Sequence, residues 1–218
     1  MKISRLTNLP LDKFIEWALY DKNSGYYMKK NPFGKEGDFI TAPNITRLFS
    51  EVIAIWVVTF WKSIGSPKKF NLLELGAGNG EMMNVITETL KNFPQCFNAC
   101  KFIIHEKSIF LINEQKKNLN HKKILWIKDL KKNNSYPTLY LANEFFDAIP
   151  IKQFFKNEET WVERFVELKN SKKVIFKEEK INIKKLEHKL KFEISKNQDV
   201  IEYSPKAFQY LKTICETI

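Results

Sequence analysis

The middle of the chain alternates short apolar runs with longer segments in which apolar residues recur every three or four positions. Short apolar runs are typical of buried strands, and longer periodic segments are typical of amphipathic helices. The predicted strands lie in NLLEL, KFIIHE, KILWI and TLYLAN, and the helices among them lie in EMMNVITETLKNF and SIFLINEQKKNL. This alternation predicts an α/β fold with a parallel sheet and helices on both of its faces.

The two flanking regions have different patterns. Before residue 68, LDKFIEWALY predicts one helix and ITRLFSEVIAIWVVTFWKS a second, which we expect to begin at Asn44 as its N-cap. The polar stretch NPFGKEGDFITAP between them predicts a loop that covers a ligand. After residue 150, KQFFKN, TWVERFVEL and KKVIFKEE predict antiparallel strands, and SPKAFQYLKTICETI predicts a helix.

The sequence therefore predicts three regions. Residues 1–67 form an N-terminal helical segment with the covering loop, residues 68–150 form the parallel α/β core, and residues 151–218 form a small antiparallel insertion with a final helix.

The formal net charge of +11 does not by itself indicate nucleic acid as the partner. Only Arg5, Arg47 and Arg164 are arginines, and the lysines are spread along the whole chain. A solvated lysine-rich surface is therefore a better interpretation than a dedicated nucleic-acid patch.

Cysteine spacing and hydropathy also narrow the class of protein. Cys96, Cys100 and Cys215 have no C-x-x-C spacing, so the sequence predicts neither a disulfide framework nor a metal site. No apolar run reaches the ~20 residues of a membrane-spanning helix, and no signal peptide is evident at the start. We therefore expect a protein of the bacterial cytoplasm without a membrane span.

The first predicted strand ends in an acid and a glycine turn, Glu74 followed by Gly76, Gly78 and Gly80. A dinucleotide site needs G-x-G-x-x-G, and here Glu81 occupies the third glycine position. No Gly-Lys-Ser/Thr follows, so a P-loop is excluded as well. Acid-x-Gly-x-Gly-x-Gly is typical of class I methyltransferases that bind S-adenosylmethionine, although a purely structural glycine turn remains the alternative.

Two more acids follow the next two predicted strands. Glu106 is placed to accept hydrogen bonds from both hydroxyls of a ribose. Asp129 is placed to bond an adenine amino group, with Leu130 against the ring, although Asp129 could equally cap the next turn. Three carboxylates at successive strand ends suit a cationic nucleoside cofactor.

The fourth predicted strand opens the block LYLANEFFDAIPIKQF. Together with SGYY, GDFITAP and WVERFVEL, this block resembles the MidA family of methyltransferases, which includes the mitochondrial complex I assembly methyltransferase. The resemblance implies a class I, Rossmann-like methyltransferase fold and S-adenosylmethionine as the methyl donor. It also implies a protein arginine as the acceptor and a respiratory complex I subunit as a protein partner.

Catalytic candidates follow from the same block. Asn143 and Glu144 are expected to face the transferable methyl, and the Glu144 carboxylate could hold a guanidinium by paired hydrogen bonds. Asp147 is either a second such group or the cap of the turn before Pro150. In the covering loop, Asp38 and Thr41 are the expected polar contacts to the cofactor.

The sequence also departs from the family pattern. Ala77 and Asn79 stand where relatives usually have Pro and Arg, and the sequence ends at Ile218, where we expect relatives to continue into further strands. A noncatalytic binding or assembly module that keeps a cofactor-binding fold is therefore an alternative function. Nucleic-acid methylation is disfavoured, because Asn143 is not followed by the Pro-Pro-aromatic block of base-amino methyltransferases. The oligomeric state stays open.

Overall fold

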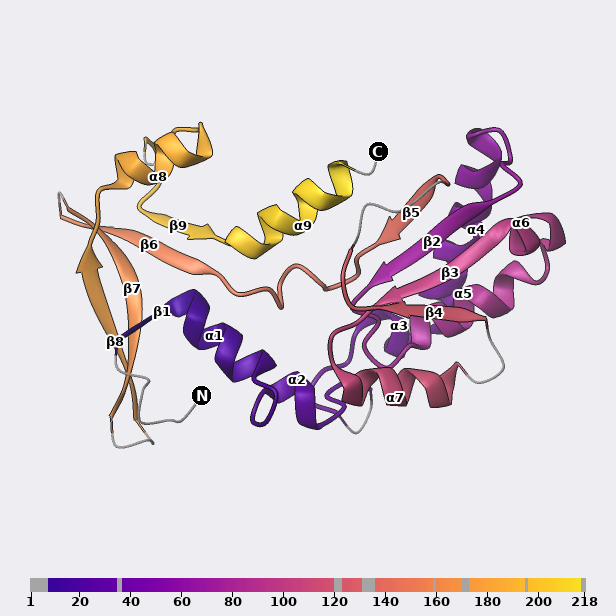
Figure 1. The fold of residues 1–218 in the computed structure, drawn as a ribbon, viewed down its shortest axis with the longest axis horizontal. Coiled ribbons are helices and arrows are strands. Elements are labelled where there is room, and N and C mark those ends of the chain that lie inside the picture. The colour runs from indigo at the N-terminus through magenta and orange to yellow at the C-terminus, as the bar shows by residue number, and fades with distance from the viewer. Residues whose placement is uncertain are drawn as a thin grey trace. The chain divides into compact units, whose positions relative to one another are not determined.

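The computed structural model describes residues 8–34, 37–119, 123–130, 136–158, 160–169, 173–194 and 196–216. The chain divides into two compact units, one made of Met1–Gly25 with Ile149–Gln209 and the other of Tyr26–Ala148 with Tyr210–Ile218 (Figure 1). No helix in these described stretches is long and apolar enough to cross a membrane.

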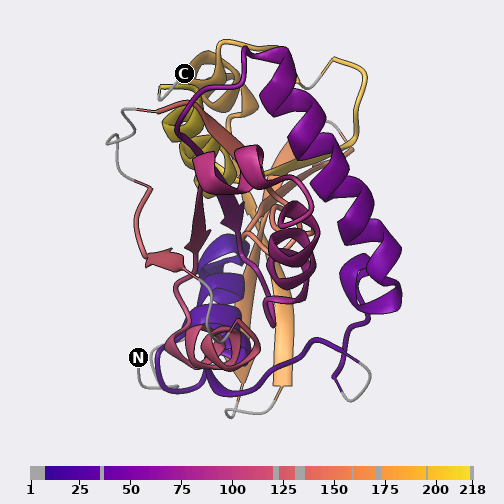
Figure 2. The ribbon, with the colours of Figure 1, turned by 90° about the vertical axis from the view of Figure 1, so that its right-hand side faces the viewer.

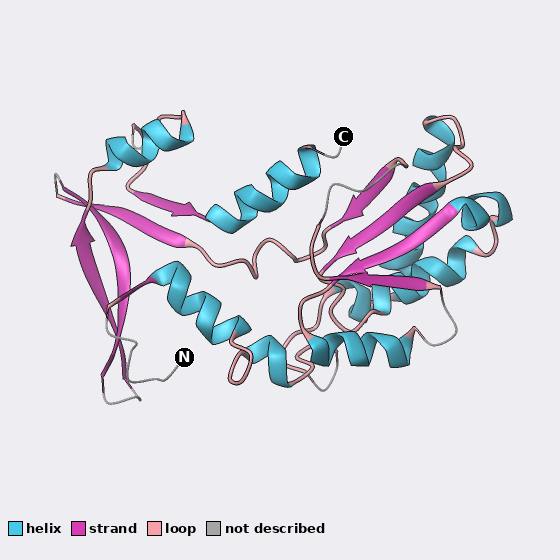
Figure 3. Ribbon diagram, in the orientation of Figure 1, coloured by secondary structure: helices cyan, strands magenta, loops and turns pink. Residues whose placement is uncertain are grey.

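The second unit holds a parallel sheet of strands β2 (Phe70–Leu75), β3 (Cys100–His105), β4 (Ile124–Ile127) and β5 (Thr138–Leu141), drawn in magenta in Figure 3. Their spatial order is β4-β3-β2-β5, so the chain first builds outward from β2 and then returns to its other side. All six residues of β2 are buried, because the strand has a neighbour on each edge and its side chains enter the cores on both faces of the sheet. The order reverses between β2 and β5, and ligands bind at such a switch point in open α/β sheets.

Both faces of this sheet are covered. On one face, α4 (Arg47–Ser63) and α5 (Glu81–Leu90) run beside one another, as the purple and magenta helices of Figure 2 show. Apolar residues of both helices and of the strands form the main core, including Val57, Trp61, Leu72, Ile86 and Ile104. On the other face, Leu73, Leu75 and Ile103 pack with Ile214 of α9 (Pro205–Cys215). The α/β prediction is therefore confirmed.

The helix beginnings follow local capping chemistry. α4 begins after Thr46, whose Oγ1 accepts a hydrogen bond from the Leu48 amide at 3.2 Å. The expectation that Asn44 would cap this helix is wrong, because Asn44 lies in the short α3 (Ala42–Ile45) and extended backbone at Thr46 separates the two helices. Ser108 caps α7 (Ile109–Asn118) by accepting from the Leu111 amide at 3.2 Å.

Two further short helices belong to this unit. α2 (Tyr26–Lys29) precedes the covering loop, and α6 (Pro94–Ala99) joins α5 to β3.

The first unit is an antiparallel sheet. The predicted strands are confirmed as β6 (Lys152–Asn157), β7 (Thr160–Lys169) and β8 (Lys173–Lys180), and β9 (Val200–Tyr203) and β1 (Leu9–Pro10) join them. The unit also contains α1 (Leu11–Tyr20) and α8 (Ile183–Leu190). Its core includes Phe154, Trp161, Ile183, Ile201 and Tyr203.

The division into three regions stays a prediction about how the sequence is organised. Residues 8–25 cluster with the antiparallel strands because β1 pairs with β7, with Leu9 opposite Val166 and Pro10 opposite Phe165. The end of α9 clusters with the parallel sheet because Ile214 packs on its core. Ile218, where the sequence ends, lies outside the described residues.

Candidate cofactor site

A pocket lies where the switch in strand order predicts one, beside the residues that follow β2 and β5. Six of the predicted site residues line it: Thr41, Glu74, Gly76, Gly78, Asn143 and Glu144. The other lining residues are Phe33, Pro43, Asn44, Ala77, Asn79 and Met82. The covering loop, the glycine turn and the end of β5 therefore contribute to one site.

The glycine turn needs glycine for two separate reasons. Gly76, Gly78 and Gly80 have φ angles of +64°, +55° and +87°, which side chains rarely adopt. A Cβ at Gly76 would also lie 2.7 Å from Cδ2 of Phe145, and one at Gly78 would lie 3.3 Å from Cδ2 of Phe33. Turn geometry and close packing both exclude side chains here.

Glu74 is a buried acid with an unused acceptor. Its side chain is 3% exposed, and Oε2 has no hydrogen-bond partner among the described residues. Burial, together with the nearby charge of Glu106, raises the pKa of Glu74 to about 8. A carboxyl group in this state, in a pocket wall, is typical of a ligand site.

Glu106 is buried as well, but its carboxylate is partly satisfied. Oε1 accepts from the backbone amides of Lys107 and Ser108, both at 2.8 Å, and Oε2 accepts from Nε2 of Gln115 at 3.3 Å. Burial raises the pKa of Glu106, and these donors oppose the shift. Glu106 does not line the pocket itself, although Gln115 links it to Gly78.

The covering loop is tied to the glycine turn by side-chain amides. Nδ2 of Asn79 donates to Oδ1 of Asn44 at 2.8 Å, and Nδ2 of Asn44 donates to Oγ1 of Thr41 at 2.9 Å. Tyr27 stacks on Phe33 with ring centroids 6.1 Å apart. The predicted contribution of this loop to the site is therefore supported by its contacts.

Besides Glu106 and Gly80, four predicted site residues lie off the pocket lining. Asp38 is exposed and bonded to Lys30 and Tyr26, and the Lys30 hydrogen bond, followed by that of Tyr26, lowers the pKa of Asp38. Asp129 is exposed after β4, and Leu130 packs against the core around Leu73. Their roles stay predictions.

Asp147 is the fourth of these residues. It is exposed, and it acts electrostatically on Tyr27, whose pKa is raised first by burial and then by the Asp147 charge.

Glu144 is held in an unusual backbone conformation. Its φ angle is +49°, in the left-handed region that costs a non-glycine residue free energy. Its side chain is exposed at the pocket, so the group remains open to a second molecule. Strained backbone of this kind clusters at functional sites.

The sequence did not reveal several pocket residues. Phe33, Pro43 and Asn44 lie in a loop that was predicted only as a whole. Gln115 does not line the pocket, but it bonds the Gly78 carbonyl from a helix that the sequence did not connect with the site. Asn79 carried a signal, because a polar residue stands inside the glycine motif itself.

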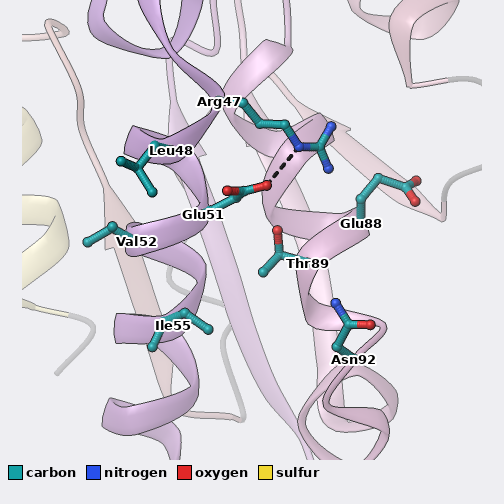
Figure 4. Close-up of a pocket in the computed structure, with 8 residues that line it drawn as sticks. All are labelled: Arg47, Leu48, Glu51, Val52, Ile55, Glu88, Thr89 and Asn92. Carbon is teal, nitrogen blue, oxygen red and sulfur yellow. Dashed lines mark hydrogen bonds and ion pairs between the residues drawn. The ribbon is translucent and has the colours of Figure 1, made fainter.

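A second groove lies between α4 and α5 (Figure 4). It is lined by Arg47, Leu48, Glu51, Val52, Ile55, Glu88, Thr89 and Asn92. Its charged groups are paired, with Nε of Arg47 2.8 Å from Oε1 of Glu51 and Nζ of Lys91 3.1 Å from Oε2 of Glu88. Within the described part of the chain, this groove has no unpartnered buried group comparable with Glu74.

The site contains no evident metal centre. Among the residues that the structure describes, no three His, Cys, Asp or Glu side chains are grouped so that they could hold a metal ion.

The parallel sheet, its switch point and the glycine turn after β2 define a Rossmann-like, class I methyltransferase type of fold. A family model described as "Putative S-adenosyl-L-methionine-dependent methyltransferase" matches residues 52–218, and the chain belongs to this family. The predicted family resemblance is confirmed.

Curated relatives are similar over most of the chain. The mitochondrial protein arginine methyltransferase NDUFAF7 of Xenopus tropicalis is 28% identical over 191 residues, covering 77% of this chain and 44% of the relative. The Drosophila melanogaster homolog is 31% identical over 194 residues, covering 78% of this chain and 44% of the relative. The chain therefore spans less than half the length of these relatives.

A solved structure shares the fold. A Burkholderia thailandensis protein crystallised with S-adenosyl-homocysteine superposes with a TM-score of 0.80 at 21% identity, covering 98% of this chain and 56% of that chain. The likeness supports the α/β architecture described above.

Proposed function

We propose that this chain binds S-adenosylmethionine in the pocket at the switch point and transfers its methyl group to a protein side chain. The observation that carries the proposal is Glu74, a buried carboxyl group in the pocket wall with one oxygen unbonded among the described residues. A buried acceptor needs a donor or a cation, and the amino group of a methionine moiety provides both.

Other residues of the site suit the rest of that ligand. The Glu106 carboxylate keeps acceptor capacity on Oε2 for a ribose hydroxyl, since Oε1 already accepts from two backbone amides. Phe33 and Met82 provide apolar surface, and Gly76 and Gly78 allow close approach to the main chain. When bound, the cofactor supplies a methyl group on a positively charged sulfur.

The proposed acceptor is an arginine side chain, in accordance with the names of the curated relatives. The exposed Glu144 carboxylate can pair with a guanidinium through two parallel hydrogen bonds and can fix the nitrogen that reacts. Asn143 adds a neutral amide beside it. A nitrogen–methyl bond forms as the sulfur–methyl bond breaks, and the nitrogen loses one proton to solvent.

The finer assignments belong to the same proposal. A respiratory complex I subunit is the protein partner that the MidA resemblance suggests, and the bacterial cytoplasm is the proposed location. Asp147 is the second candidate for contact with the acceptor.

Calorimetric titration with S-adenosylmethionine tests the binding step. We expect saturable binding by the 218-residue chain, a large loss for Glu106→Ala and complete loss for Gly78→Val. Glu51→Gln, in the groove between α4 and α5, is the matched control and should bind like the wild type. A folded wild-type chain that binds nothing contradicts the proposal.

Transfer of a labelled methyl group to proteins of the source organism tests the chemical step. Labelled arginine that disappears with Glu144→Gln is the expected result. Binding without any transfer favours the noncatalytic binding module instead.

A further inference from the structure

Gln115 is a fully buried polar residue of α7, with 0% of its side chain exposed. Burying an amide is costly unless its polar atoms are bonded. Nε2 donates to the Gly78 carbonyl at 2.9 Å and to Oε2 of Glu106 at 3.3 Å, and Oε1 accepts from Nε1 of Trp126 at 2.9 Å. The side chain is therefore bonded in three directions.

The chemistry of the partners determines how this amide is oriented. The indole of Trp126 can only donate, and the Gly78 carbonyl can only accept. A flipped amide would place a donor against a donor and an acceptor against an acceptor. The Gln115 amide consequently has one orientation, in which the two N–H groups of Nε2 point toward the Gly78 carbonyl and the Glu106 carboxylate.

The three partners come from three neighbouring strands of the sheet or from the turns that follow them. Gly78 follows β2, Glu106 follows β3, and Trp126 lies in β4. α7 approaches the glycine turn closely, since a Cβ at Gly80 would lie 3.4 Å from Cγ and 3.5 Å from Cα of Gln115. Gly80, expected from the sequence to bind the cofactor, thus packs against α7 and does not line the pocket.

Gln115 has a specific effect on Glu106. The two backbone donors, the amides of Lys107 and Ser108, both bond Oε1, whereas the Gln115 amide bonds Oε2. The side-chain amide therefore determines where Oε2 lies, and Oε2 keeps acceptor capacity for a ligand hydroxyl.

We propose that Gln115 is a positioning residue for nucleoside binding, which fixes the Gly78 peptide and the Glu106 carboxylate in the relative placement that a ribose requires. The inference rests on the proposed function and deepens it, since Gln115 is not among the pocket-lining residues and acts through its two partners. The role of Gln115 is to maintain the hydrogen bonds that hold Gly78 and Glu106, and it does not contact the ligand.

The first test uses the protein without ligand. Gln115→Met keeps the side-chain length and removes the donors, and Trp126→Phe removes only the indole bond and is the matched control. Carboxyl-carbon NMR titration should show a higher pKa for Glu106 in Gln115→Met and no comparable change in Trp126→Phe. The charged groups that act with Glu106 are Lys107 and Glu74, so the Glu74 titration is followed alongside.

The second test is a double-mutant cycle read by calorimetry with S-adenosylhomocysteine. We expect Gln115→Met to weaken binding about tenfold, the effect of losing a hydrogen bond to a charged group. Added to Glu106→Gln, it should weaken binding little further, whereas with Glu74→Gln the two losses should multiply. Losses that multiply fully with Glu106→Gln overturn the inference.

Two controls separate the possible failures. Gln115→Leu also removes the donors and adds no charge beside Glu106, so it replaces Gln115→Met if that variant does not fold. A folded wild-type chain that binds no S-adenosylhomocysteine contradicts the proposed function. The NMR titration then decides on Gln115 alone, and an unchanged Glu106 titration overturns this inference.

Discussion

Two clusters of acidic side chains, one in each unit, differ in whether a cation of the chain balances them. In the antiparallel unit, Nζ of Lys152 lies 3.3 Å from Asp12 and 2.5 Å from Glu163. In the parallel unit, Glu74 and Glu106 are both buried, and one oxygen of Glu74 has no partner among the described residues. In the first arrangement Lys152 is the cation, whereas in the second an oxygen of Glu74 is available to a cation supplied by a ligand.

The pKa directions express the same difference. Burial alone would lower the pKa of Lys152, but the hydrogen bond and charge of Glu163, with Asp12, raise it. Burial and the charge of the neighbouring acid together raise the pKa of Glu74 to about 8. Removing one partner of an ion pair within the chain leaves an uncompensated charge, whereas acids that have no cation mark a candidate ligand site.

The largest effect is expected from adding a methyl group to the glycine turn. Gly76→Ala should abolish cofactor binding and lower the free energy of unfolding by about 3 kcal/mol, because left-handed strain and overpacking against Phe145 add together. Gly65→Ala is the control, since Gly65 also has positive φ (+88°) but no atom within 4 Å of its added Cβ. Urea unfolding compares the two variants, and equal losses would show that strain alone matters.

Replacing Lys152 should leave Asp12 and Glu163 without a cation of the chain, which is the situation of Glu74 in the site. Lys152→Met leaves Asp12 and Glu163 without their ion pair, and we expect a loss of about 2 kcal/mol in unfolding free energy at pH 7. Lys177→Met removes the more exposed pair with Glu167 and should cost clearly less than Lys152→Met, because solvent screens an exposed pair. Similar losses in both variants would remove the distinction between buried and exposed pairs.

Glu74→Gln should change how stability depends on pH. The folded pKa of Glu74 is raised to about 8, so its stabilising contribution is complete at acidic pH and is lost as pH rises through that value. The wild type should lose up to ~1.4 kcal/mol per pH unit through this group, and the variant should lack that slope. Unfolding titrations between pH 5 and pH 9 measure the difference, and parallel curves contradict it.

Cofactor binding should release protons near neutral pH. Glu74 is protonated below its pKa of about 8 in the unliganded protein, and an ammonium group would favour its charged form. Calorimetry at pH 7 in two buffers of different ionisation enthalpy should report about one proton released per ligand bound. Identical enthalpies in both buffers would place the amino group elsewhere.

The smallest effect is expected in the groove between α4 and α5. Glu51→Gln breaks an exposed i, i+4 pair with Arg47 and should change the unfolding free energy by less than about 0.5 kcal/mol. Its cofactor affinity should equal that of the wild type. A weaker affinity would extend the ligand site to this groove.

Much of the fold could be predicted because its signals are local. Strand and helix periodicity gave the order of the elements around β2, and the motif after Glu74 marked a turn that only glycines can form. The cap of α4 was missed, since Asn44 and Thr46 are both good caps by type. Their backbone conformations decided between them.

The site was only partly predictable for the same reason. Three acids at strand ends looked equivalent in sequence, yet Glu74 and Glu106 are buried together and Asp129 is exposed. Whether a strand-end side chain meets the pocket depends on the turn that follows and on the helix packed above it. Neither is encoded in the few residues around the acid.

By itself, the sequence determined the parallel α/β core, the glycine turn and the family, because periodicity, backbone freedom and motif spacing act over short stretches of chain. Only the tertiary structure decided that Asn79 bonds Asn44, that Gln115 joins Gly78 to Glu106, and that β1 pairs with β7. These contacts join residues far apart in the chain. They form because the packing of the fold brings these buried polar groups within hydrogen-bond distance of one another.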